Sequence, residues 1–438
     1  MSELTKKQLR IVNNALEGFF SIKALKPARS LDDFKVSNVL ARELCLSNNR
    51  VVLMTDIGLV HLRTAVATIN DADICDGYAD YSDIHSASVK VLKEMLSRGE
   101  QPDNAIEFVA LVRSALATAI DKRTFAVPVF GIKLVEIGVI TLGQFRIVPA
   151  TPGALAEAGA DRIDDHVAKA IDQASMKYWL IGSARGTNRV AEQSFRLQAE
   201  LLMGLLAICA ASMFERGAEA FRIGIIMSPE QANGQAAWFS WSEEKRALAM
   251  HRKFRAAQDL EVGVDLAKQI GESEVIEVAC RFFQADTRTP LEEAILKAVY
   301  WYSEAHRELV PVMKLVKYWS AVETFFSINE KDITRSVSAG LASVLVYGGF
   351  GFIPPDEYKA TRKRISDLYG SRSRAVHRAS YNHVTGTDTA LLSQWVAWML
   401  INMVSFQIRG YTTVEEIKKH ADRIDARMTH VADRDVPT

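Results

Sequence analysis

The sequence predicts an α+β protein, in which a mixed α/β region over residues 1–285 precedes an all-helical bundle over residues 286–438. The length of 438 residues exceeds what one ordinary hydrophobic core supports, which indicates two domains or more. Residues 121–150 are rich in Val, Ile, Phe and Thr, and Gly and Pro recur every few residues, a pattern typical of short strands joined by tight turns. After Pro290 the apolar residues recur at helical spacing, which predicts helices alone.

The mixed region carries further element signals after residue 150. A strand is expected at 178–182, and the polar pair Thr187 and Asn188 then precedes apolar residues at helical spacing. Strands are expected again at 221–227 and 236–241. The sequence contains no internal repeat, so this region is expected to form a mixed domain and not a solenoid.

The helical region begins with several independent start signals. Thr289 is a suitable N-cap, Pro290 fits the first helical position, and Glu292 and Glu293 fall in the first turn. The polar stretch 284–290 is therefore the expected domain boundary. Further helices are expected at 333–347, 356–369, 371–380, 389–408 and 414–427, with a backbone bend at Gly370.

The composition excludes some classes of partner. Lys and Arg together number 53, as do Asp and Glu, so no overall electrostatic field draws the chain to nucleic acid or membrane, and only a local patch would meet a polyanion. The apolar stretches at 201–214 and 391–406 are too short or too interrupted for a membrane span, and the N-terminus does not resemble a signal peptide. We expect a cytoplasmic protein with no membrane contact.

The four cysteines lie far apart, at Cys45, Cys75, Cys209 and Cys280. None has a Cys or His neighbour at metal-ligand spacing, so they are expected to be buried small side chains in a reducing compartment.

An acidic run and a glycine pair are candidate binding sites in the sequence. The run "DADICDGYADYSDIH" holds Asp71, Asp73, Asp76, Asp80, Asp83 and His85. A calcium loop needs an oxygen ligand at position five and Glu at position twelve, where this chain has Cys75 and Ser82, so we favour a solvated loop before a helix. The stretch "IGSARGTNR", residues 181–189, lacks the lysine and spacing of a phosphate loop and offers an anion only a helix N-terminus. Neither a metal nor a cofactor is predicted.

The segment "LYGSRSRAVHRASY", residues 368–381, crowds Arg372, Arg374 and Arg378 around His377. A further basic run precedes it, at Arg362, Lys363 and Arg364. A histidine can take and give a proton near neutral pH, and the planar arginine fork matches phosphate oxygens. Residues five apart lie about 140° apart around a regular helix, so Arg372 and His377 share no face unless the backbone bends. The alternative is a basic, exposed helix start.

The same segment resembles the signature of the HEPN superfamily (higher eukaryotes and prokaryotes nucleotide-binding domain), in particular of its Apea-like branch. The matching residues are, in order, Leu368, Tyr369, Arg372, Ser373, Val376 and His377. Upstream, "KYWSAVETFFS" is similar to the first long helix of that branch, with Glu323 ahead of Phe325 and Phe326 and with Arg335 near the start of the next helix. The resemblance covers roughly residues 291–408. It departs from the family pattern at Arg378, where many members have glycine.

The resemblance implies a HEPN-like bundle that cleaves RNA without a metal and leaves a 2′,3′-cyclic phosphate. Arg372 and His377 would be catalytic, with Ser373 and Glu323 in support. The residues that would hold RNA phosphates are Arg374, Arg378, Arg362, Lys363 and Arg364. Two protomers would complete the site across a two-fold axis, so a homodimer through the bundle is expected.

The resemblance also implies a setting in bacterial antiphage defence or a toxin–antitoxin-like system, with a regulatory partner or trigger acting on residues 1–285. Two alternatives stay open. In the first, the bundle is a catalytically inert module for dimerisation or nucleotide binding. In the second, it is a purely structural domain.

Glu323 stands among apolar residues in "SAVETFF", so it is expected to face the bundle interior. An unpaired buried carboxylate is costly, and Arg335 or the Arg372 region would then supply a partner. The alternative is a solvent-facing glutamate on an amphipathic helix.

Overall fold

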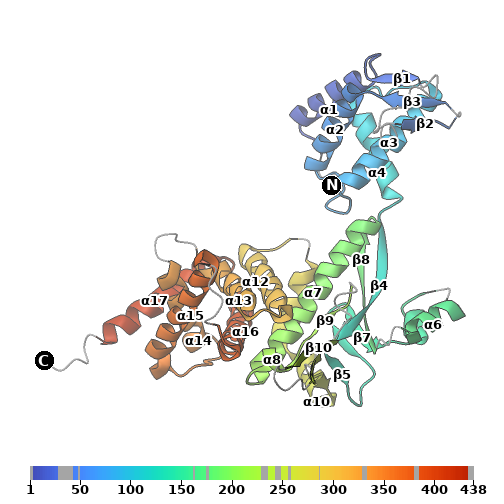
Figure 1. Cartoon of the computed structure of the whole chain (residues 1–438). Coiled ribbons are helices and arrows are strands. Elements are labelled where there is room, and N and C mark those ends of the chain that lie inside the picture. The colour runs from blue at the N-terminus through green and yellow to red at the C-terminus, as the bar shows by residue number, and fades with distance from the viewer. Residues whose placement is uncertain are drawn as a thin grey trace. The chain divides into compact units, whose positions relative to one another are not determined.

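The computed structural model describes residues 3–27, 43–47, 50–160, 163–173, 177–227, 235–241, 248–254, 258–285, 287–327, 333–378 and 384–432. Its contacts divide the chain into two compact units. The first unit comprises Met1–Thr124 and Ser183–Phe195, and the second comprises Phe125–Gly182 and Arg196–Thr438. The fold is mixed, with sheets and helices in the N-terminal region and helices towards the C-terminus (Figure 1).

In its described residues the first unit combines a small sheet with four complete helices. It also includes the parts of β8 (Tyr178–Gly186) and α7 (Asn188–Met213) that lie within Ser183–Phe195. Its elements are α1 (Lys6–Phe19), β1 (Leu25–Pro27), β2 (Glu43–Cys45), β3 (Val51–Met54), α2 (Asp56–Asp71), α3 (Tyr81–Arg98) and α4 (Ala105–Ala117). The strands form an antiparallel sheet in the order β1-β3-β2, so β2 lies at an edge. Apolar side chains of the helices, including Phe19, Val66 and Phe108, form the core. Cys45 on the edge strand is exposed, contrary to the expectation that all four cysteines are buried.

The acidic run of the first unit forms a turn and a helix cap. Asp73 has a positive φ of 46°, and its Oδ1 accepts a hydrogen bond from the Gly77 N–H at 2.7 Å. Asp80 caps α3, and Arg189 donates to its carboxylate. The Thr187 hydroxyl donates to Asp83 Oδ2 at 2.6 Å. These contacts support the loop-before-a-helix interpretation, and no group of three metal-ligating side chains occurs among the residues described.

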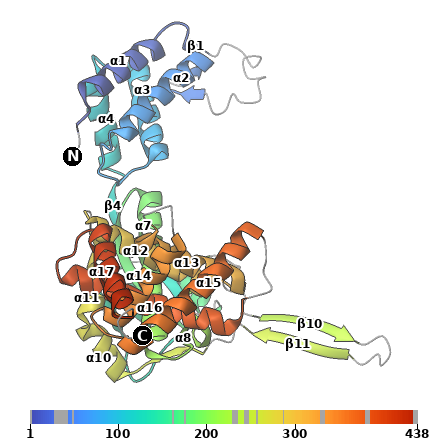
Figure 2. The same ribbon diagram turned by 90° about the vertical axis from the view of Figure 1, so that its left-hand side faces the viewer.

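The second unit begins with strands. They are β4 (Asp121–Phe130), which continues from the first unit, β5 (Ile132–Leu134), β6 (Ile140–Leu142), β7 (Phe145–Pro149), β8 (Tyr178–Gly186), β9 (Gly224–Ile225), β10 (Gln235–Trp241), β11 (Leu248–Phe254) and β12 (Leu260–Val262). Five of them form a sheet in the order β6-β7-β8-β4-β9, while β12 pairs with β5 and β10 with β11. The strands predicted within 121–150 are confirmed, and the strand predicted at 221–227 shrinks to β9. Figure 2 shows β10 and β11 as a separate hairpin.

Helices complete the second unit. They are α5 (Pro152–Glu157), α6 (Asp165–Gln173), α7 (Asn188–Met213), α8 (Gly217–Ala220), α10 (Val264–Glu272), α11 (Glu274–Gln284), α12 (Pro290–Arg307), α13 (Pro311–Phe326), α14 (Ile333–Tyr347), the short 3₁₀ helix η3 (Pro355–Glu357), α15 (Tyr358–Arg378), α16 (Gly386–Ile408) and α17 (Val414–Ala432). The expected start of α12 is confirmed, because Thr289 forms a capping box with Glu292 ahead of Pro290.

α15 is one continuous helix, so the predicted bend at Gly370 is wrong. An isolated glycine costs a helix only about 1 kcal/mol relative to alanine. No proline follows Gly370 within α15, and packing of α15 against α14 and α13 compensates for that cost. Arg372 and His377 therefore remain about 140° apart around α15.

The predicted boundary near residue 285 falls inside the second unit, because the mixed region and the helical region share contacts across it. The Ser303 hydroxyl on α12 donates to the Glu200 carbonyl on α7 at 3.2 Å. The Ile223 N–H donates to Nε2 of His306 at 3.0 Å. Burial lowers the pKa of His306 to about 3, so this imidazole stays neutral and works as an acceptor inside the core.

Two helices, α7 and α16, are long and apolar enough to cross a membrane. In each, 72% of the most apolar window is buried within the protein. Core helices that are mostly buried have the same length and composition, so the two helices are weak evidence for a membrane span.

Asp425 on α17 allows a test of this packing, since it is buried and accepts hydrogen bonds from the Tyr358 hydroxyl at 2.9 Å and Arg362 at 2.6 Å. Asp425→Ala should lower the free energy of unfolding by about 2 kcal/mol, because it removes the ion-pair partner of a half-buried guanidinium. It also removes one of two hydrogen-bond partners of the buried Tyr358 hydroxyl, which keeps Ser343 at 3.3 Å. Urea denaturation followed by tryptophan fluorescence measures it, and all seven tryptophans lie in the second unit. The control Asp422→Ala on the same helix removes a carboxylate that is 56% exposed and pairs with Lys418, and it should change little. Equal effects of the two changes would contradict the packing role.

Candidate functional site

The candidate site begins at Glu323 near the end of α13. This helix buries Trp319, Val322 and Phe326 against the rest of the bundle, and Glu323 lies beside them. The Glu323 side chain keeps only 19% of its surface exposed. A carboxylate at this depth needs partners, and α15 packs alongside α13 to supply them.

Two residues of α15 hold the two oxygens of Glu323. Tyr369 and Arg372 are three residues apart, so they lie on one face of the helix. The Tyr369 hydroxyl donates to Oε1 of Glu323 at 2.7 Å, and Nη2 of Arg372 donates to Oε2 at 3.0 Å. The expected basic partner of Glu323 is thereby confirmed as Arg372, and the solvent-facing alternative is wrong.

Aromatic packing fixes this group of side chains. The rings of Trp319 and Tyr369 pack in a T-shaped arrangement, at a centroid distance of 5.1 Å and an interplanar angle of 90°. The guanidinium carbon of Arg372 lies 5.7 Å from the centroid of the Tyr369 ring. Burial, and then the Glu323 carboxylate, raise the pKa of Tyr369, so its hydroxyl remains a hydrogen-bond donor.

Arg372 is anchored yet keeps hydrogen-bonding capacity. Its side chain is 21% exposed, so part of it reaches the surface of the bundle. Its Nε is buried and makes no hydrogen bond to any described residue. An anion that approaches this side chain would meet a cation whose orientation is already fixed by Glu323, which lowers the entropy cost of binding.

The other predicted residues near Arg372 also lie on α15. Ser373 is half-buried beside it. Arg374 is exposed, and its Nη2 donates to the Ser371 hydroxyl at 2.9 Å. His377 and Arg378 belong to the last turn of α15, and their side chains lie outside the described residues. The convergence of His377 on Arg372 therefore stays a prediction.

The preceding basic run divides into two kinds of side chain. Arg362 pairs with Asp425 on α17, and Arg364 pairs with Asp388 on α16 at 2.6 Å. These two arginines tie α15 to neighbouring helices. Lys363 is exposed between them, and in the described part of the chain it contacts no carboxylate.

Sequence reasoning did not count Tyr369 among the functional residues, although it belongs to the matched pattern. The signal available was its position three residues before Arg372. That spacing alone does not show that the hydroxyl meets Glu323, because the contact depends on α13 and α15 lying side by side.

A cleft of about 600 Å³ lies elsewhere in the second unit, between the β6–β7 turn and helices α10 and α11. Leu142, Ile276 and Cys280 line it, together with the side chains of Glu277 and Arg281. Burial raises the pKa of Cys280 to about 12, so the thiol stays protonated and is a poor nucleophile.

Comparison with protein-family models, with curated proteins and with solved structures gave no match for this chain. Functional inference therefore rests on the residues and their geometry.

A double-mutant cycle tests the coupling of Glu323 and Arg372. Glu323→Gln and Arg372→Met should each destabilise the second unit, and the double variant should lose less than the sum because the pair is already broken. We expect a coupling energy of about 1 kcal/mol, given that both side chains are partly screened by solvent. Urea denaturation gives the four free energies. The control Arg374→Ala removes an exposed arginine from the same helix and should leave the free energy of unfolding nearly unchanged. If the effects of Glu323→Gln and Arg372→Met on that free energy are strictly additive, the ion pair does not contribute to stability.

Proposed function

We propose that the C-terminal helical bundle is a metal-independent endoribonuclease of the HEPN type. The observation that carries the proposal is the anchored Arg372, held by Glu323 and Tyr369 at the bundle surface and five residues before His377 on the same helix. The resemblance of this stretch to the HEPN signature points in the same direction. The bundle is taken to work in the cytoplasm.

The chemistry follows from the two residue types. One His377 imidazole removes the proton of a ribose 2′-hydroxyl, and the 2′-oxygen attacks the adjacent phosphorus. The bond from phosphorus to the 5′-oxygen of the next nucleotide breaks, and that oxygen receives a proton from a protonated imidazole. Arg372 donates hydrogen bonds to the phosphorane oxygens as their negative charge grows. The products are a 2′,3′-cyclic phosphate and a free 5′-hydroxyl, and DNA is excluded because it lacks the 2′-hydroxyl.

The continuous form of α15 favours a site shared by two chains. On one regular helix Arg372 and His377 diverge by about 140°, so a single copy is a poor catalytic unit. A two-fold axis beside the end of α15 would bring two arginines and two histidines around one phosphate. We therefore propose a homodimer formed through the C-terminal bundle.

Binding of the flanking RNA would rest mainly on the exposed cations. Arg374 and Lys363 are open to solvent and suit sequence-independent contacts with phosphates, and Arg378 follows the site directly. To bind phosphate, Arg362 and Arg364 would have to break their ion pairs with Asp425 and Asp388. We therefore assign these two arginines a smaller contribution to RNA binding. The proposed setting is antiphage defence or a toxin–antitoxin-like system, with a regulatory partner on the N-terminal region.

One observation favours a second candidate. The Glu323 carboxylate neutralises Arg372, as expected for a purely structural ion pair. The bundle would then be an inert HEPN module for dimerisation or nucleotide binding. Phosphodiester cleavage that depends on both Arg372 and His377 separates the two candidates.

The cleavage test uses purified protein, single-stranded RNA and excess EDTA. Arg372→Ala and His377→Ala should each lower the rate by at least about 100-fold, because each removes charge stabilisation or proton transfer from the transition state. Arg374→Ala should cost less than about tenfold, as for one phosphate contact. Lys359→Ala, an exposed charge loss on the same helix, should leave the rate unchanged. Cleavage that persists in both Arg372→Ala and His377→Ala would exclude the assigned site, and a wild-type dimer that cleaves no RNA would favour the inert module.

The shared site is tested by complementation. Light scattering should show a dimer at micromolar protein concentration. Arg372→Ala and His377→Ala proteins, each inactive alone, should regain part of the activity when unfolded together and refolded as a mixture, since a mixed dimer keeps one arginine and one histidine. A monomer, or a mixture as inactive as its components, would refute a composite site even if the wild type cleaves RNA.

A further inference from the structure

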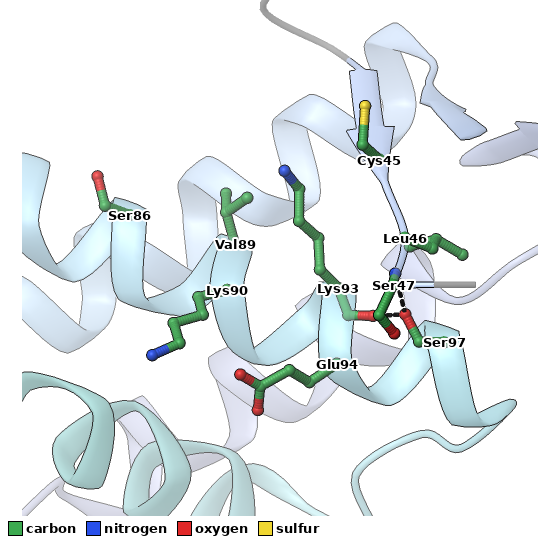
Figure 3. A pocket seen from close by; sticks show the side chains of 9 residues that line it. All are labelled: Cys45, Leu46, Ser47, Ser86, Val89, Lys90, Lys93, Glu94 and Ser97. Carbon is green, nitrogen blue, oxygen red and sulfur yellow. Dashed lines mark hydrogen bonds between the residues drawn. The ribbon is translucent and has the colours of Figure 1, made fainter. Parts of the chain in front are cut away.

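A groove of about 420 Å³ lies in the first unit, between the edge strand β2 and helix α3. Its lining residues are Cys45, Leu46, Ser47, Ser86, Val89, Lys90, Lys93, Glu94 and Ser97 (Figure 3). The first three come from β2 and the residues after it, and the other six come from one face of α3. A strand edge therefore forms one wall and a helix forms the other.

The backbone of β2 has hydrogen-bonding groups directed into this groove. The Leu46 N–H donates to the Arg50 carbonyl at 2.8 Å, so residue 46 is bonded towards β3. In an antiparallel pair alternate residues bond to the partner strand, so the backbone groups of Cys45 and Ser47 point away from β3. The Ser47 N–H follows this rule and donates to the Ser97 hydroxyl at 3.1 Å. The N–H and carbonyl of Cys45 have no partner among the described residues.

The helical wall is long enough for a short extended segment. Its lining residues run from Ser86 to Ser97 at spacings of three and four. At about 1.5 Å per residue this face is roughly 16 Å long, which equals about five residues of β-strand. The helical wall thus has the length of a short strand, and on the opposite wall Cys45 offers one backbone donor and one backbone acceptor.

The charge of the groove indicates what kind of strand fits. Lys93 is half-buried, and Figure 3 shows its side chain extending from α3 towards Cys45. Within the described part of the chain it makes no ion pair, and neither does the exposed Lys90. A single acidic residue, Glu94, lines the groove against these two lysines. The Glu43 carboxylate on β2 accepts a hydrogen bond from the Cys45 thiol at 3.5 Å. Two lysines that make no ion pair favour an occupant that carries negative charge.

We infer that this groove binds an extended acidic peptide segment, which adds to the sheet as a strand beside β2. The backbone of the segment would pair with the N–H and carbonyl of Cys45, which have no partner among the described residues. Its acidic side chains would face Lys93 and Lys90. The occupant is a peptide and not a small anion, because the unpaired groups include a backbone donor and acceptor on a strand edge. The inference concerns the first unit and is independent of the proposed ribonuclease.

The test uses the full chain and a capped seven-residue probe in which glutamate alternates with valine, flanked by threonine. Fluorescence anisotropy of the labelled probe measures its affinity. The exposed thiol of Cys45 supplies a second readout, since a strand beside β2 would shield it from iodoacetamide. We expect saturating probe to slow alkylation of Cys45 at least fivefold, with the buried Cys75 as an internal reference.

Three changes define the outcome. Lys93→Glu should weaken binding at least tenfold, whereas Arg98→Glu, an exposed residue of α3 outside the groove, should not. A probe with glutamine in place of glutamate should bind at least tenfold more weakly. A probe methylated on alternate backbone nitrogens should lose binding, and this arm needs no protein variant. The inference is overturned if the acidic probe fails to bind at millimolar concentration, if the methylated probe binds equally well, or if inorganic phosphate alone protects Cys45 to the same degree.

Discussion

α16 carries apolar residues on every side, and such a helix is stable in water only when every side is covered. Trp395, Met399, Met403 and Phe406 are all buried, and each contributes on the order of 1.5–3 kcal/mol through removal from water. Two buried polar side chains of α16 make hydrogen bonds there, since Ser393 bonds to the Tyr302 hydroxyl at 2.9 Å and the Asn402 amide donates to the Trp398 carbonyl. The Asn402 Oδ1 is buried and has no hydrogen-bond partner among the described residues. Other helices of the second unit therefore pack around α16 and cover its apolar sides.

Helices from both the mixed and the helical regions supply the cover. α12, α13 and α14 pack on α16 from the C-terminal region, while α8 and α11 pack on it from the mixed region. The two regions therefore share one core. The polar stretch 284–290 marks a change of secondary structure, and this change is what the sequence pattern shows. The residues on both sides of the stretch are nevertheless packed into one compact unit.

Prediction from the sequence succeeded where the signal was local. α14 begins and ends at the predicted residues, and Thr289 caps α12 as its neighbours indicate. The partner of Glu323 was also predictable, because a carboxylate among apolar residues has few alternatives. Long-range contacts were out of reach. Asp425 and Asp388 come from α17 and α16, so nothing in the basic run itself indicates that Arg362 and Arg364 are paired.

The first unit is assembled from two separated pieces of chain, and this has a consequence for its synthesis. Thr187 and Arg189, which bond to Asp83 and Asp80, lie in the second piece, Ser183–Phe195. At about 5–20 residues per second a ribosome needs several seconds to pass from the end of the first piece to the end of the second. During that interval the nascent chain carries an unfinished first unit while β4 to β7 of the second unit emerge. The two units therefore complete their folding in an interleaved order, and an N-terminal fragment that stops at residue 124 would lack part of its own structure.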